Sequence, residues 1–373
     1  MNTATAIDSG IHNLLFNCMG LQAGDDLLIV RELGRSDYYS ATLPDLIAAA
    51  ARASGISVVL EGAPFLEEVR EFPRNISAAM SASDHTLFLA RIGDQLRFSD
   101  SSDFSSQTMC YALDEESFAT PFCSADYEFF RELKHRINDA LFGEKQITIR
   151  CREGTHLVGV SPKDPGDENQ GDVTVRRFPL TVFRPMSAAT FSGRLAISKW
   201  LSPTGSRFYQ PASVIIDEVV FAEIRNGRIT GFEGNRRDVE KIQKHYAFVS
   251  GKYGIDRDVI HSWHAGIHPQ NGYNGLAIDN LTRWGGSAFG NPRYLHLHTC
   301  GDYAPGEICV SAFDPTITAD DTVLWSRGEL VYAQAPEIQD LMVGYPGMKA
   351  LFANPQREFG LGESQDVSSP DAL

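Results

Sequence analysis

The alternation of apolar and polar positions between residues 5 and 150 predicts helices that alternate with short, buried strands. Residues 27–30 (LLIV) are apolar at every position, which is typical of a strand covered on both faces. An alanine-rich helix over residues 43–54 leads into a second apolar strand at residues 58–60, and a further helix precedes residues 86–89. This order predicts an open parallel sheet with right-handed crossovers and helices on both of its faces.

After residue 144 the pattern changes to strands. Residues 146–151 alternate between polar and apolar side chains, and the Asn-Gly pair at residues 226–227 favours a hairpin, because it supplies the positive φ angles of a type I′ turn. Helices are expected at residues 126–141, which carry an apolar stripe, and at residues 238–249. Further strands are expected within residues 173–183, 191–197, 214–229 and 310–331, with loops at residues 99–107 and 162–171.

Together these segments predict an α/β protein of two domains. We expect a Rossmann-like domain with an open parallel sheet over residues 1–144 and a mixed, mainly β domain over residues 145–355 that holds metal and substrate. Residues 356–373, which are rich in serine, aspartate, glutamate and glycine, are expected to form a flexible tail.

The stretch from His261 to His298 contains half of the chain's 10 histidines. If its two ends are strands, side chains alternate between faces, so that His264 and His268 share one face while His296 and His298 share one face of the second strand. Two imidazoles two residues apart can hold one ion, and a third from the first strand would complete a site with open positions. His261 or His268 could replace His264 after a shift of register.

Composition narrows the class of protein. The chain has 373 residues, 43% of them hydrophobic and 22% charged, and no run of eighteen apolar residues, which predicts a globular protein without a membrane span. The N-terminus lacks the pattern of a signal peptide, and we expect a cytoplasmic protein. A net charge of -15 argues against a nucleic-acid partner. The six cysteines form no Cys-x-x-Cys pair, and neither a dinucleotide-binding glycine motif nor a phosphate-binding loop is present.

Five short motifs, in their order and spacing, give the chain a resemblance to a known family. They are residues 21–25 (LQAGD), 153–157 (EGTHL), 226–229 (NGRI), 264–267 (HAGI) and 296–298 (HLH). With them the chain resembles the aminopeptidase T and aminopeptidase S type metallopeptidases and their relatives, the dihydroxypyridine ring-cleaving dioxygenases. The resemblance implies an aminopeptidase-T-like fold and a homodimer.

The resemblance also implies a metal site that differs from that of the peptidases. The peptidases hold two metals with glutamates, a histidine pair and an aspartate, whereas the dioxygenases hold one iron with two histidines and a carboxylate. In this chain His264 stands at a glutamate or histidine position and His298 at an aspartate position, next to His296. The expected ligands of one divalent ion are therefore His264, His296 and His298, with Fe(II) favoured and Zn(II) possible.

Three other residues are candidates for the chemistry. His156 replaces an aspartate of the family motif and could act as a general base, or it could be a hydrogen-bonded loop histidine. His268 could support a metal ligand or transfer a proton, or could simply be hydrogen-bonded at a domain interface. Tyr294 could donate a hydrogen bond to an oxyanion at the site, or could be a packing residue with its hydroxyl at a rim.

These observations favour a mononuclear Fe(II)-dependent oxygenase that acts on a small molecule or peptide. A rival hypothesis is a peptide-binding protein of the same fold without catalysis, for example one that presents a precursor peptide in natural-product biosynthesis. A working metallo-aminopeptidase is the third hypothesis. Glu233, Glu240, Asp279 and Asp302 are spare carboxylates that could each be solvated or serve as a ligand.

Overall fold

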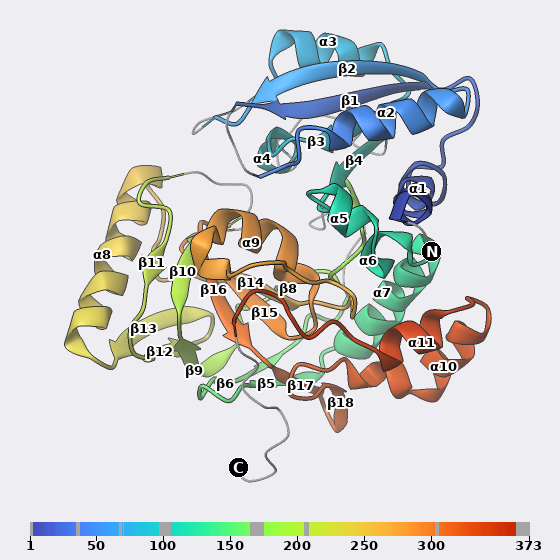
Figure 1. Cartoon of the computed structure of the whole chain (residues 1–373). Helices are drawn as coiled ribbons and strands as arrows, with labels where there is room; N and C mark the ends of the chain where they lie inside the picture. Colours follow the sequence, from blue (N-terminus) through green and yellow to red (C-terminus); the bar gives the residue numbers. More distant parts are fainter. Residues whose placement is uncertain are drawn as a thin grey trace.

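The computed structural model describes residues 3–34, 38–66, 69, 71–96, 106–164, 175–204, 209–302 and 306–362, and places their strands in three sheets (Figure 1). Most of the predicted loop at residues 99–107 lies outside these ranges, as does much of the acidic connection at residues 162–171. Within the described part, no helix is both long enough and apolar enough to cross a membrane.

The first sheet has five parallel strands in the order β2-β1-β3-β4-β7. Its strands are β1 (Asp26–Leu33), β2 (Ser57–Pro64), β3 (His85–Leu89), β4 (Gln107–Cys110) and β7 (Arg176–Phe178). Leu27 and Ile29 pack with helix α2 (Leu43–Ala53) on one face, while Leu28 and Val30 pack with helix α3 (Arg74–Ser81) on the other. The predicted open parallel sheet, covered on both faces, is therefore confirmed.

The other helices of the first 144 residues connect the parallel sheet to the rest of the chain. They are α1 (Thr3–His12), the π-helix η1 (Asn13–Cys18), α4 (Ile92–Leu96), α5 (Glu115–Phe118), α6 (Pro121–Ser124) and α7 (Tyr127–Leu141). Helix α7 begins where the Asp126 carboxylate accepts hydrogen bonds from two backbone N–H groups of its first turn. Its apolar stripe is buried against the core of the β-rich part, as its spacing predicts.

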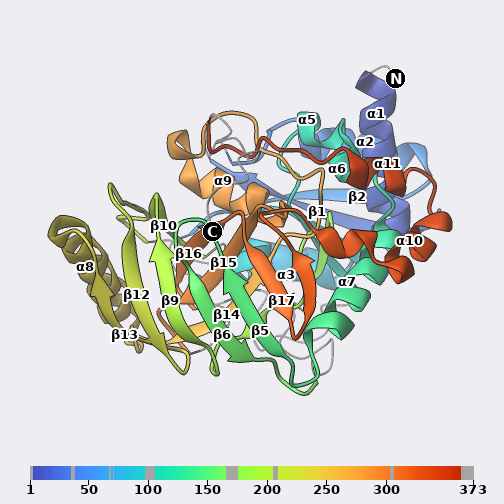
Figure 2. The same cartoon turned by 90° about the horizontal axis from the view of Figure 1, so that it is seen from below.

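The other two sheets have antiparallel strand pairs and pack face to face (Figure 2). The seven-stranded sheet has the order β13-β12-β9-β6-β5-β17-β18, and the six-stranded sheet has the order β11-β10-β16-β15-β14-β8. The main hydrophobic core lies between them, with Trp263 and Leu297 from the six-stranded sheet and Ile149 and Leu195 from the seven-stranded sheet. This confirms a mixed fold with an α/β part and a mainly β part.

The strands of these sheets are short. They are β5 (Gln146–Arg150), β6 (His156–Val160), β8 (Met186–Ser187), β9 (Ser192–Ile197), β10 (Trp200–Pro203), β11 (Val214–Ile215), β12 (Val220–Arg225), β13 (Arg228–Glu233), β14 (Ile260–Ala265), β15 (Tyr294–Thr299), β16 (Ile308–Phe313), β17 (Thr316–Ala319) and β18 (Thr322–Trp325). Asn226 and Gly227 have φ angles of 48° and 68°, which confirms the predicted turn between β12 and β13.

Helices flank the β-rich part on two sides, and one more lies over the six-stranded sheet (Figure 1). They are α8 (Arg236–Tyr253), α9 (Leu281–Ser287) with the 3-10 turns η2 (Ala277–Asp279) and η3 (Ala288–Gly290), and η4 (Val331–Gln334), α10 (Pro336–Val343) and α11 (Met348–Ala353). Residues 356–362, the described start of the predicted tail, pack on this part, because Phe359 is buried beside Trp284 and Phe313. These first tail residues therefore belong to the folded structure.

Candidate metal centre

Three histidines meet on one face of the six-stranded sheet, on the neighbouring strands β14 and β15. His264 lies directly opposite His296 in the antiparallel register, and Ser262 lies opposite His298. The residues that alternate with them, Trp263, Leu295 and Leu297, point to the opposite face and belong to the main core. The alternation of a β-strand thus places all three imidazoles on the side away from the core.

A β-bulge sets this arrangement. Ile260 pairs with Thr299 and Ser262 pairs with His298, so that His261 is an extra residue on β14. If the register at Ile260 continued without it, Trp263 would lie opposite His296, and His264 would face the core. The bulge therefore turns His264 to the face of the other two histidines, in line with the general role of bulges in redirecting side chains near sites.

The three imidazoles are close enough to share one ion. Their ligand atoms all lie within 4.8 Å of one another. The Nε2 atoms of His264 and His298 are 3.1 Å apart, and the ring centroids of His264 and His296 are 3.9 Å apart. Two nitrogen ligands about 2.1 Å from one ion and about 95° apart are separated by about 3.1 Å. The same distance also fits a hydrogen bond between two neutral imidazoles.

The donor set fits a divalent ion of the imidazole-binding metals. Neutral imidazole suits zinc and iron, and three such ligands leave open positions on the ion. Among the described residues, the group of ligand-type atoms contains these three histidines and no carboxylate. None of the spare carboxylates Glu233, Glu240, Asp279 and Asp302 is brought into this group.

Small polar side chains continue the same face of the sheet onto strand β16. Ser311 lies opposite His296 and Cys309 lies opposite His298. The Tyr294 ring stacks beside His296, with centroids 5.2 Å apart, and its hydroxyl is 3.1 Å from Ser311 Oγ. Burial raises the pKa of Tyr294 well above its usual value, so its hydroxyl stays protonated. Tyr294 therefore adjoins the triad, with its hydroxyl turned towards β16.

Aromatic side chains cover the triad. Phe289 lies edge-on to His296 and to Tyr111, whose strand-end position belongs to the α/β part. The three histidines are only 4%, 6% and 6% exposed. The triad is therefore enclosed between its own sheet and the carboxyl edge of the parallel sheet, where open α/β sheets commonly bind ligands.

The structure does not bring His156 to the triad. It lies on β6 in the seven-stranded sheet, and its side chain is exposed, with Nε2 3.5 Å from an Arg150 nitrogen. Its neighbour Leu157 points into the core between the sheets. Strand alternation therefore sends His156 to the outer face, on the far side from the six-stranded sheet.

His268 is placed apart from the triad as well. Strand β14 ends at Ala265, so the alternation that would have put His268 with His264 no longer applies. Its ring stacks on Phe130 with centroids 4.0 Å apart and meets Phe122 edge-on, and only 1% of the residue is exposed. Burial lowers the pKa of His268 to about 3, so the ring is neutral at ordinary pH.

Several residues of the site were not anticipated from the sequence. Ser262, Cys309, Ser311 and Phe289 all contact or face the histidines. The alternation of β16 (ICVSAF) was a signal for two of them, because it puts the cysteine and the serine on one face. Phe289 left no such signal, since a tight turn after α9 positions it.

No protein-family model matches the sequence, and neither does any curated protein. Among solved structures, the fold is similar to that of 2,5-dihydroxypyridine dioxygenase from Pseudomonas putida KT2440, with a TM-score of 0.59 and 13% sequence identity over 91% of this chain and 99% of that one. AmpT from Thermus thermophilus is matched over 88% of this chain and 99% of that one, with a TM-score of 0.48 and 11% identity. The similarity to the dioxygenase establishes the aminopeptidase-T-like fold.

Proposed function

We propose that this protein is a mononuclear metal-dependent oxygenase that acts on a small molecule or peptide, with Fe(II) as the favoured ion and Zn(II) as the alternative. The observation that carries the proposal is the buried triad of His264, His296 and His298. Its three neutral donors differ from the carboxylate-rich sets that hold two metals in hydrolytic enzymes. The fold shared with a dioxygenase supports the same class of reaction.

The chain's own residues would do the following. The three imidazoles hold the ion on a rigid pair of strands, and the bulge at His261 keeps His264 in place. An iron ion bound there would supply a centre that can activate dioxygen and polarise a chelating substrate. Tyr294 supports the His296 ring and keeps a protonated hydroxyl beside it, and Phe289 excludes water from the site.

His156 and His268 have the positions described above, and we assign neither of them a proton-transfer step. His156 is exposed on the outer face of another sheet, and His268 is buried between two phenylalanines. The proposed chemistry therefore rests on the triad and its immediate neighbours.

The experiment is anaerobic purification with metal analysis, followed by oxygen-uptake measurements with Fe(II) and candidate hydroxylated aromatic substrates. We expect about one ion per chain, and an affinity at least about 100-fold lower in the variant His296→Ala/His298→Ala, since two of three ligands are lost. The matched control is His156→Ala, which removes a histidine from the outer face and should keep the ion.

Three results would contradict the proposal in distinguishable ways. Iron and zinc both far below one per chain after reconstitution would mean that the 3.1 Å contact is a hydrogen bond, and would favour a peptide-binding protein without a metal. Peptide binding in calorimetry that is undiminished in His296→Ala/His298→Ala would support that alternative. Release of amino-acid anilides with added cobalt or zinc would instead support an aminopeptidase.

A further inference from the structure

A cavity lies in the β-rich part, at the start of strand β15. Its volume is about 710 Å³, which is within the range of about 300–1,000 Å³ that is usual for small-molecule sites. It is formed by the loop before β15, the turn after β18 and the segment after α11, and none of the three histidines lines it. A ligand in this cavity would therefore occupy a site separate from the triad.

Arginines dominate the charge of the cavity. Arg293, Arg327 and Arg357 line it together with a single acidic residue, Glu329. Asp314 neutralises Arg293 and Glu329 faces Arg357, so among the described residues the surplus positive charge of the cavity is that of Arg327, on a chain whose net charge is -15. A locally cationic cavity on an acidic protein is suited to an anionic ligand.

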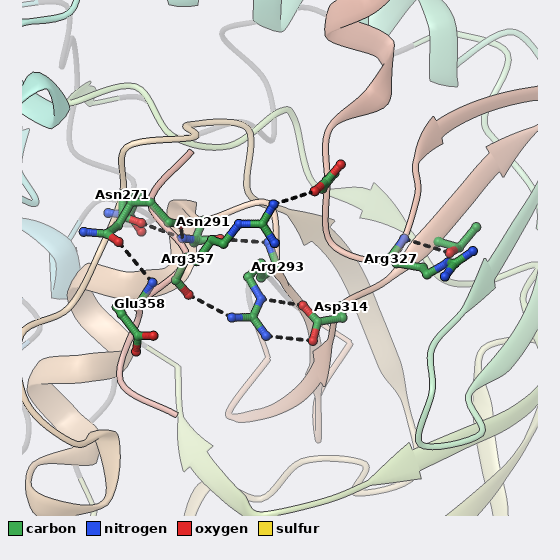
Figure 3. Close-up of polar contacts among 10 residues, drawn as sticks. Asn271, Asn291, Arg293, Asp314, Arg327, Arg357 and Glu358 are labelled. Carbon is green, nitrogen blue, oxygen red and sulfur yellow. Dashed lines mark hydrogen bonds and ion pairs between the residues drawn. The ribbon is translucent and has the colours of Figure 1, made fainter. Parts of the chain in front are cut away.

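Arg293 is held in place by hydrogen bonds and forms a rigid part of the cavity wall (Figure 3). The Arg293 guanidinium donates to both carboxylate oxygens of Asp314, at 2.6 and 2.9 Å, and to the backbone carbonyl of Arg357 at 2.8 Å. Gly328 packs directly on this pair, because a Cβ atom there would lie 2.6 Å from Asp314 Oδ1. The backbone that carries the other two arginines is thus held against a salt-bridged support.

The guanidinium groups of Arg327 and Arg357 are available to a ligand. Arg357 is 3.3 Å from Glu329, but both side chains are more than half exposed, at 58% and 54%, so this ion pair contributes little and can open. Within the described residues, the Arg327 guanidinium has no acidic partner, and only its backbone N–H is bonded, to Thr316 Oγ1 at 3.1 Å. These two side chains can therefore turn to a ligand without breaking a strong contact.

The backbone conformation of Arg327 is a second observation that supports a ligand site here. Arg327 has a φ of 48° and Gly328 a φ of 79°, in a two-residue turn between Ser326 and Glu329. This turn favours asparagine, aspartate or glycine at its first central position, so an arginine there is held in an unfavourable backbone conformation. Strain of this kind is common at ligand sites.

Apolar side chains complete the cavity. Leu330, Phe352 and Pro355 line it beside the arginines. Arg357 donates a hydrogen bond to the Glu329 carboxylate, which is the type of group that a carboxylate ligand would offer to it. From the charge, the apolar wall and this internal carboxylate, we propose that the cavity binds an organic carboxylate with an apolar body, which displaces Glu329 from Arg357.

The test is calorimetric titration of the full chain with 3-phenylpropionate and with its neutral amide. We expect the carboxylate to bind at least about tenfold more tightly than the amide, because guanidinium–carboxylate hydrogen bonds are charge-assisted. Arg357→Gln should weaken carboxylate binding to the level of the amide, and Arg327→Gln should weaken it by at least about threefold. Glu329→Gln should tighten it by about threefold, because it removes the internal competitor.

Two control variants show whether carboxylate binding is specific to this cavity. Arg236→Gln removes a positive charge from an exposed ion pair with Glu240 on helix α8, outside the cavity, and should change the affinity by less than about twofold. His296→Ala separates this cavity from the triad, since a carboxylate that binds a metal there would lose affinity. Equal binding of acid and amide, loss of binding in His296→Ala, or equal effects of Arg357→Gln and Arg236→Gln would each overturn the proposal.

A second pair of probes identifies the source of the carboxylate. An N-acetylated tetrapeptide of alanine and phenylalanine is compared with its C-terminally amidated form. Binding of the free-acid peptide alone, weakened by Arg357→Gln, would assign the cavity to a peptide C-terminus, and binding of 3-phenylpropionate alone would assign it to a small molecule. If neither acid binds the wild-type protein, the inference is wrong.

Discussion

Two buried polar clusters lie close to the boundary between the α/β part and the β-rich part, and they are built on opposite principles. At the carboxyl ends of β1 and β3, Glu32 and Arg91 form a bidentate ion pair with distances of 2.9 and 2.5 Å. The Arg91 guanidinium also lies over the rings of Tyr38 and Phe65. On the six-stranded sheet, by contrast, three identical imidazoles gather without a carboxylate among them.

The two clusters differ in whether their own side chains satisfy one another. Opposite charges neutralise each other in the first cluster, so folding alone completes it. A set of like donors on one face has no complementary member of its own, and such a set is typical of sites that hold an ion. Burial of polar groups alone is therefore weak evidence for a binding site, and the repetition of one donor type is the feature on which the proposed metal site depends.

The largest expected effect is the loss of stability when the Glu32–Arg91 ion pair is broken. Arg91→Met leaves the Glu32 carboxylate buried without its cation, and we expect the free energy of unfolding to fall by about 3–5 kcal/mol. Urea unfolding measures the change. The double variant Glu32→Leu/Arg91→Met removes both charges and should recover most of the loss, and a single variant as stable as the wild type would contradict the role of this pair.

A smaller effect is the stability that the protein should gain when the triad binds a metal ion. Because an ion binds only the folded chain, zinc or anaerobic Fe(II) at about 100 times its dissociation constant should add about 2.7 kcal/mol of stability. Thermal unfolding with and without metal measures this gain. It should vanish in His264→Ala and persist in His156→Ala, and a full gain in His264→Ala would show that the two strands do not share the ion.

The smallest effect, when it is measured between about pH 7 and about pH 5, concerns a histidine that is in neither cluster. Burial lowers the pKa of His268 to about 3 in the folded chain, while the unfolded chain binds this proton near pH 6.5. Stability is therefore complete above pH 6.5 and falls as the pH decreases from 6.5 towards 3, by up to about 1.4 kcal/mol per pH unit.

His268→Phe should reduce this slope. The urea midpoint of each protein is measured at about pH 7 and at about pH 5. The change in midpoint between these two pH values is then compared between the wild type and the variant. His245, whose pKa is also lowered by burial, to about 4, is present in both proteins and cancels. An unchanged slope would mean that His268 is protonated in the folded state.

The sequence predicted those features that depend on local alternation. The apolar run at residues 27–30 indicated a strand buried on both faces, and the pattern around His296 and His298 indicated an apolar back and a polar front. The Glu32–Arg91 pair could not be predicted, because its members are 59 residues apart and meet only when β1 and β3 align. His268 was grouped with His264 because alternation was extended past the end of a strand.

The bulge at His261 makes this part of β14 tolerant of a one-residue deletion. Because the strand holds one residue more than its pairing with β15 needs, deleting His261 would leave Ile260 opposite Thr299 and Ser262 opposite His298, and His264 would stay opposite His296. In a strand without a bulge, the same deletion would turn the side chains on one side of it to the other face. Proteins with this fold could therefore gain or lose the bulge through a one-codon insertion or deletion while the three histidines keep their places.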